Sequence, residues 1–156
     1  MAKAIPDGYH TATPYLIISG AAQAIDFYRN VFGATELLRM ADPDGRIAHA
    51  EIKIGDSVIM LADEAPGHRS PRSLGGAAVS TMLYVENVDD CFNRAIAAGA
   101  KAQRPLANQF YGDRSGTIED PFGHVWTIAT HVEDVPPEEM KKRVESFMRQ
   151  QQASQH

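Results

Sequence analysis

Cysteine is nearly absent from the chain, since Cys91 is the only one among 156 residues. A single thiol excludes a disulfide framework and any zinc site built from several cysteines. It is compatible with a reducing compartment. Residues 1–20 also lack the basic start and the long apolar stretch of a signal peptide. We therefore expect a cytoplasmic protein.

Long hydrophobic runs and basic clusters are missing too. No segment approaches the roughly 20 consecutive apolar residues that cross a bilayer, so we expect no membrane partner. The net charge is −5, and Lys and Arg are scattered, which disfavours nucleic acid as a partner. The Gly-rich stretch SLGGAA lacks the Lys and the spacing of a P-loop, so nothing indicates nucleotide binding.

What remains is the composition of one globular unit, 44% hydrophobic and 22% charged. Its first half predicts a strand, a helix and three strands. The first strand is TPYLIISG, and the following helix spaces Ala21, Ile25, Tyr28 and Phe32 along one face before Gly33. The later strands are ATELLRM, RIAHAEIKI and SVIMLAD, and the sequence DPDG predicts a type I turn between the first two.

The second half repeats this order after a loop rich in Pro, Gly and Ser at residues 64–78. The strand STMLYVEN leads to a helix that begins at Asn87 and ends before Gly99. The strands KAQRPLA, FYGDRSGTIE and HVWTIATH follow, with DPFG as the last turn. The near-constant spacing of corresponding glycines indicates a duplication, and it aligns Asp63 with His131 at the ends of the last strands.

The tail PPEEMKKRVESFMRQQQ predicts a further helix at about 136–151, with Met140, Val144 and Phe147 on one face. This apolar stripe packs either on the chain's own sheet or on a second copy. We thus expect a single domain: a first module at about 10–63, a linking loop at 64–78, a second module at about 79–132, and the terminal helix.

The paired modules, together with AIDFYRNVFGA and DPFGH-x-W, resemble the vicinal oxygen chelate superfamily, which includes glyoxalase I, bleomycin-resistance proteins, fosfomycin-resistance enzymes and extradiol dioxygenases. The stretches TPYL, HAEI, SVIMLADE, YGDRSG and DPFGHVWTIATHVEDV are similar to its PhnB-like, or demethylubiquinone-methyltransferase-like, branch. The resemblance covers residues 13–131. It implies an α+β fold in which two βαβββ modules form a U-shaped, partly open barrel around a cavity, and a homodimer.

Metal-dependent members of that superfamily carry His or Glu on the first and last strand of each module. Aligned on its helix starts and last strands, this chain has Thr13, Ile59, Ser80 and Thr127 there. A one-residue error would bring the opposite strand face into play, and the neighbours are Pro14, Met60, Thr81 and Ile128. None supplies imidazole or carboxylate, so we predict no cofactor and no metal ligand at these positions. A divalent metal held by a different set of residues is the alternative.

Other residues carry candidate chemistry. His49 and Glu51 lie two apart and face one side of their strand, either toward a metal or ligand or as the polar face of a sheet. Asp63 and His131 form an acid/base pair if the modules bring them together; otherwise they only end their strands. Arg114 suits a ligand carboxylate or phosphate, or it pairs locally with Asp113.

Two functions follow. In the first, the protein binds a small, partly apolar molecule, as metal-free bleomycin-resistance proteins do. Phe110 and Tyr111 then line a cavity rather than the core. The ligand-binding candidates are Thr13, His49, Glu51, Ser80, Phe110, Tyr111, Arg114 and Thr127. The alternative is a lyase, isomerase or dioxygenase whose metal or acid/base site has moved. Its catalytic candidates are His49, Asp63 and His131.

Overall fold

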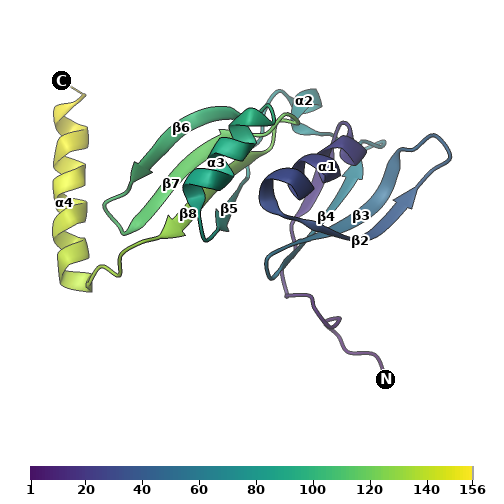
Figure 1. Ribbon diagram of the computed structural model, residues 1–156, viewed down its shortest axis with the longest axis horizontal. Helices are drawn as coiled ribbons and strands as arrows, with labels where there is room; N and C mark the ends of the chain where they lie inside the picture. The colour runs from purple at the N-terminus through teal and green to yellow at the C-terminus, as the bar shows by residue number, and fades with distance from the viewer. Residues whose placement is uncertain (156) are drawn as a thin grey trace.

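The computed structural model describes residues 1–155 and divides them into two modules of the same connectivity and a terminal helix (Figure 1). The predicted α+β fold is confirmed. The first module consists of β1 (Tyr15–Ile18), α1 (Ala21–Phe32), β2 (Thr35–Ala41), β3 (Ile47–Ile54) and β4 (Ser57–Asp63).

The linking segment contains a short helix that the sequence did not predict, α2 (Pro71–Leu74). The second module and the tail follow it. They consist of β5 (Ser80–Tyr84), α3 (Val88–Ala97), β6 (Lys101–Asn108), β7 (Asp113–Glu119), β8 (Val125–His131) and α4 (Pro137–Ala153). No helix in residues 1–155 is long and apolar enough to cross a membrane.

Each module forms its own four-stranded sheet, in the orders β1-β4-β3-β2 and β5-β8-β7-β6. The first strand of each module runs parallel to the last, and the remaining pairs are antiparallel. Both sheets are open, so neither closes into a barrel. The helices α1 and α3 pack against each other and cover one side of the sheets (Figure 1). We call the opposite side of each sheet the open face.

The hydrophobic core lies under the two helices and is continuous between the modules. Tyr28 and Phe32 of α1 pack against Trp126 of β8, with ring centroids 5.2 and 4.8 Å apart. The Trp126 indole N–H donates to the Asp120 carboxylate at 2.9 Å. All three aromatic residues are buried. The modules therefore share one core although their sheets are separate.

The turns predicted from DPDG and DPFG are formed in the same way. Asp42 accepts hydrogen bonds from the backbone N–H of Asp44 and Arg46, and Asp120 accepts them from the residues at the same offsets. Gly123 has a φ of +91°, which an L side chain rarely adopts. The DPFG sequence thus sets both the turn and the position of the Asp120 carboxylate in the core.

The predicted alignment of the last strands is wrong by one residue. The Asp63 carboxylate accepts from the Gly20 and Ala21 N–H groups at the start of α1, both at 3.0 Å. Thr130 has the corresponding role at α3, where its hydroxyl accepts from the Val88 N–H at 3.0 Å. The structural counterpart of Asp63 is therefore Thr130, not His131.

The error comes from the turns before the last strands. Ile54 and Ser57 flank a tight turn, whereas Glu119 and Val125 flank a longer one. Because side chains alternate along a strand, a shift of one residue exchanges the two faces. Ile59 is buried and corresponds to the helix-facing Trp126, so its predicted alignment with a metal position is also wrong.

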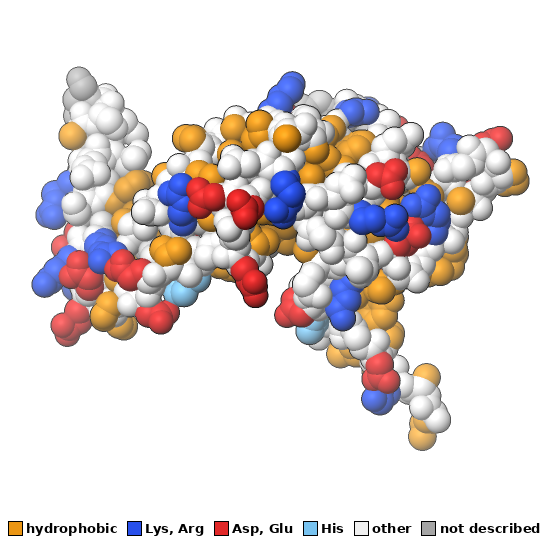
Figure 2. All heavy atoms as spheres, in the orientation of Figure 1, with side chains coloured by type: hydrophobic (Ala, Val, Ile, Leu, Met, Phe, Trp, Pro, Cys, Tyr) orange, Lys and Arg blue, Asp and Glu red, His pale blue; other side chains and the backbone are white. Residues whose placement is uncertain are grey.

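The helix α4 stands at the far end of the second sheet, away from the first (Figure 1). Its Phe147 ring lies 4.8 Å from that of Phe110, and Arg143 donates to the Phe110 carbonyl at 3.0 Å. Figure 2 shows charges of both signs at its base, where Arg143 pairs with Glu133 and Glu139. No residue of α4 is buried, so its apolar stripe is only partly covered.

Candidate functional site

A chain of hydrogen bonds crosses the open face of the first sheet. The Tyr15 hydroxyl on β1 lies 2.8 Å from Nδ1 of His49 on β3. The other ring nitrogen of His49, Nε2, lies 2.8 Å from Oε2 of Glu51. Tyr9, from the segment before β1, donates to the remaining oxygen of Glu51. Tyr15 and Glu51 both pair with Met60 of β4, which places them in one row on this face.

The charge on Glu51 determines how this chain is protonated. Glu51 is only 7% exposed, and the hydrogen bonds from Tyr9 and then from His49 lower the pKa of its carboxyl. The same contact with Glu51 raises the pKa of Tyr9. An ionised carboxylate only accepts hydrogen bonds, so Nε2 of a neutral His49 carries the proton. Nδ1 is left to accept the hydrogen bond of Tyr15.

Two cavities meet at Tyr15. The first-module cavity has a volume of about 700 Å³, and its walls include Ile17, Ala62 and the residues 64–66. The intermodule cavity, of about 720 Å³, lies between β1 and β5. Thr13 and Ser80, two of the predicted ligand-binding residues, both line the intermodule cavity. The duplication therefore brings this predicted pair to one place.

His124 connects the modules at the wall of the intermodule cavity. Its Nε2 lies 2.9 Å from the carbonyl oxygen of Ile17, on the edge strand β1 of the other sheet. Sequence reasoning missed this contact of His124. It also missed Tyr9 and Tyr15, although Tyr15 lies two residues after Thr13 and so shares its strand face.

The second sheet has a different polar group at the end of β8. His131 lies between two carboxylates, with Nδ1 at 2.8 Å from Asp113 and Nε2 at 2.7 Å from Asp134. Both contacts raise the pKa of His131, and the contact with Asp113 has the larger effect. Tyr84 donates to the second oxygen of Asp113 at 2.8 Å. Asp63 is occupied at the start of α1, so the predicted Asp63–His131 pair does not form.

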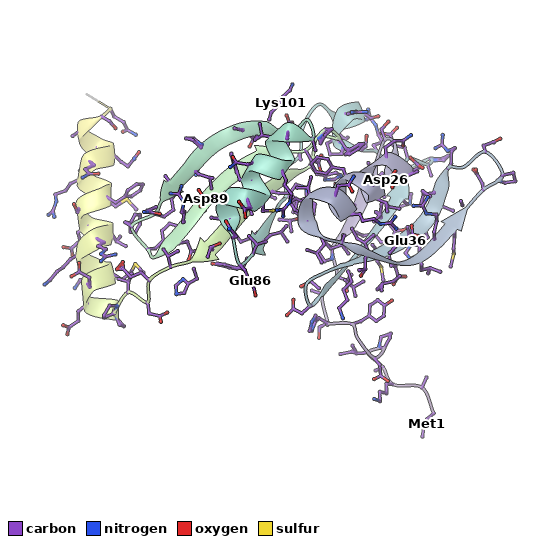
Figure 3. All side chains as sticks on the ribbon, viewed as in Figure 1. Met1, Asp26, Glu36, Glu86, Asp89 and Lys101 are labelled. Carbon is purple, nitrogen blue, oxygen red and sulfur yellow. The ribbon has the colours of Figure 1, made fainter. Side chains whose placement is uncertain are left out.

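The remaining predicted residues lie apart from Tyr15. The hydroxyls of Thr127 and Thr117 are 2.9 Å apart on the second sheet. Arg114 forms two hydrogen bonds with Asp89 of α3, at 2.9 and 2.8 Å, so its local partner is Asp89 and not Asp113. Figure 3 shows Asp89 on that helix. The ring of Phe110 contacts those of Tyr111 and Phe147, at the junction with α4.

The side chains at the superfamily's metal positions do not suit a divalent ion. With the corrected alignment, Met60 replaces Ile59 as the counterpart of Thr127, and Thr13 and Ser80 complete the set. A thioether and three neutral hydroxyls are poor ligands for the metals of such sites. Elsewhere in residues 1–155, no group of three or more His, Cys, Asp or Glu side chains is arranged to hold a metal ion.

Comparison with known proteins agrees with this architecture. An uncharacterized protein of Mycobacterium tuberculosis is 42% identical over 139 residues, which cover 86% of this chain and 82% of that protein. The crystal structure of TioX from Micromonospora sp. ML1 superposes with a TM-score of 0.62 at 26% identity, covering 81% of this chain and 100% of the other. The PhnB protein from Bacillus cereus, at 18% identity, shares the fold with a TM-score of 0.61 over 78% of this chain and 99% of its own.

The model of one protein family matches most of the chain. The model of the Glyoxalase/Bleomycin resistance protein/Dioxygenase superfamily matches residues 9–128, which include β1 to β7 and the first part of β8. This match and the PhnB-like fold confirm the resemblance drawn from the sequence motifs. The chain belongs to the Glyoxalase/Bleomycin resistance protein/Dioxygenase superfamily.

Proposed function

We propose that this protein binds a small, partly apolar molecule at Tyr15, in the two cavities that meet there, without a metal at the superfamily's strand positions. The observation that carries the proposal is the composition of the cavity walls. Apolar side chains such as Ile17 and Ala62 surround a few polar groups, as in most small-molecule sites. Tyr15 itself is 48% exposed and available for contact.

We further propose that a second copy of the chain covers the open faces and completes the cavities. Large apolar side chains are exposed on these faces, including Met40 on the first sheet and Met82 on the second. Phe147 and Met148 add exposed apolar surface on α4. Exposed apolar surface commonly marks an interface where it is gathered on one face. A symmetric dimer would bury it and shield a ligand from water.

The cytoplasm is the compartment that we propose for this dimer. The support is chemical: Cys91 is the only cysteine and is free and buried, which suits a reducing environment. The net charge of −5 supports a small molecule rather than nucleic acid as the ligand.

Ligand binding is tested by a thermal-shift screen of aromatic and aliphatic small molecules on protein purified without added metal. A ligand at 100 times its Kd is expected to stabilise the fold by about 2.7 kcal/mol. Tyr15→Ala should abolish the shift, whereas Ile96→Ala, on the exposed side of α3, should leave it unchanged. Elemental analysis of the same sample should find no stoichiometric divalent metal. Stoichiometric zinc, nickel, manganese or iron would contradict the metal-free site.

The dimer is tested separately by light scattering. The wild-type chain is expected to have twice the mass of a protomer, and Met82→Glu should shift it toward the monomer. A wild-type monomer at high concentration would refute the dimer but leave ligand binding open to the thermal-shift test.

A further inference from the structure

We propose that Tyr15, His49 and Glu51 form an acid–base site that takes up the hydroxyl proton of a weakly acidic ligand, a phenol or an enol. The inference rests on the proposed function, because it assigns chemistry to the same face of the first sheet. It goes further by naming the class of ligand and the atom of the protein that receives the proton.

The direction of the hydrogen bonds defines what Tyr15 offers to a ligand. Glu51 is ionised, so Nε2 of His49 donates to it, and Nδ1 of the neutral ring accepts from Tyr15. The single proton of the Tyr15 hydroxyl is thereby directed at His49. Tyr15 lines both cavities, and its oxygen has only lone pairs left for a ligand there. A ligand that binds this oxygen must bring a hydrogen-bond donor, and in a largely apolar cavity a hydroxyl on an aromatic or conjugated molecule fits best.

The same geometry allows the ligand to ionise. The ligand hydroxyl gives its proton to the Tyr15 oxygen while Tyr15 passes its own proton to Nδ1 of His49. The ligand becomes an oxyanion that accepts a hydrogen bond from Tyr15, and His49 becomes an imidazolium. Only O–H and N–H bonds are formed or broken, and no further reactant is needed. Glu51, 2.8 Å from Nε2, stabilises the imidazolium charge.

The second sheet shows why the order of the three groups matters. There the carboxylate of Asp113 stands in the middle, accepting from Tyr84 on one side and facing His131 on the other. Tyr84 therefore donates to a carboxylate, and this contact raises its pKa. In the first sheet the imidazole stands between the phenol and the carboxylate, as in catalytic triads. Only that order places the imidazole where it can take the tyrosine proton.

The test uses 4-nitrophenol, whose absorbance distinguishes the phenol from the phenolate. At a pH where the free probe is mostly the phenol, titration with wild-type protein should give the phenolate spectrum on binding. His49→Gln should still bind the probe, as followed by protein NMR, but leave it as the phenol. Glu51→Gln should reduce ionisation at least tenfold. Glu86→Gln, at an exposed carboxylate just after β5, is the matched control and should behave as wild type.

The outcomes separate the two proposals. If wild-type protein binds 4-nitrophenol as the neutral phenol, the acid–base site is refuted while ligand binding on this face stands. If the probe does not bind at all, the assigned ligand class is refuted, and other ligands in the thermal-shift screen then decide on the proposed function.

A second measurement does not depend on reversible binding. 4-Nitrophenyl acetate reacts when the Tyr15 oxygen attacks the acetyl carbon, 4-nitrophenolate leaves, and the phenol proton passes to His49. Peptide mass spectrometry should find Tyr15 acetylated at least tenfold faster than Tyr84, although Tyr84 is more exposed, at 63% against 48%. His49→Gln should remove the difference. Equal rates for the two tyrosines in the wild type would refute the proposed transfer to His49.

Discussion

The hydroxyl of Tyr28, on the helix of the first module, donates to the carboxylate of Asp120, in a turn of the second module, over 2.5 Å. Both side chains are buried. Burial, followed by the charge of Asp120, raises the pKa of Tyr28 well above its ordinary value, so the phenol stays protonated and donates. The contact joins residues 92 positions apart and ties the DPFG turn to the shared core.

We predict that Tyr28→Phe destabilises the protein by about 1.5–3 kcal/mol, the usual worth of a hydrogen bond to a charged group. Asp120→Ala should cost more, because it leaves the buried donors of Tyr28 and Trp126 without an acceptor. Urea unfolding measures both. Tyr84→Phe is the control, since Tyr84 also donates to a carboxylate but is 63% exposed, and should cost less than about 1 kcal/mol. Similar losses for Phe at both positions would contradict this account.

Close packing predicts a second effect, at Gly116 of β7. A Cβ atom there would lie 2.6 and 2.9 Å from two ring carbons of Phe92 on α3. Gly116→Ala should therefore cost about 1–3 kcal/mol through overpacking. Phe92→Leu replaces the ring with a smaller side chain and so relieves this contact. The double variant Gly116→Ala/Phe92→Leu should therefore lose less free energy of unfolding than the sum of the two single variants. Strict additivity in urea unfolding would show that the contact is not the cause.

The elements and turns could be predicted from the sequence because their signals are local. Helical spacing before Gly33, the strand patterns, and the DPDG and DPFG turns each lie within a few residues. The repeated order of these elements then indicated two modules. The face on which a strand residue lies depends instead on the length of the preceding turn. That is why the sequence pattern wrongly aligns Ile59 with a metal position and Asp63 with His131.

The partners of the site residues could be predicted least. His49 and Glu51 were recognised together because they lie two apart on one strand. Tyr9 lies in a segment without secondary structure, so no periodicity indicated that it reaches Glu51. Arg114 pairs with Asp89 on a helix rather than with its neighbour Asp113, because adjacent residues of a strand point to opposite faces. Such contacts depend on the tertiary fold.

The contacts of Glu64 lead us to expect a loss of stability at acidic pH. Hydrogen bonds from the hydroxyls of Ser70 and Ser73, and from the Ser70 N–H, lower the pKa of its carboxyl to about 2. The ionised form is thus favoured in the folded state. The stability that it contributes is fully present above the ordinary value of 4.5 and is lost as the pH falls toward 2. Melting temperatures of wild type and Glu64→Gln should differ at neutral pH and converge on acidification. A difference that is constant down to the lowest pH would contradict the assignment.

The contribution of His131 to stability is expected to change with pH in the opposite direction. Asp113 and Asp134 raise its pKa above 6.5, so the protonated imidazole is favoured in the folded state. Its contribution to stability is fully present below the ordinary value and is lost as the pH rises through the folded value. A neutral ring has one N–H and can donate to only one carboxylate. Because Asp134 is fully exposed and Asp113 is buried, the bond to Asp134 should break first. NMR titration of the His131 ring should give a raised pKa in wild type and a smaller rise in Asp113→Asn, where only Asp134 remains. His131→Gln should flatten the melting profile around neutral pH, and an unchanged profile would show that the two contacts add nothing to stability.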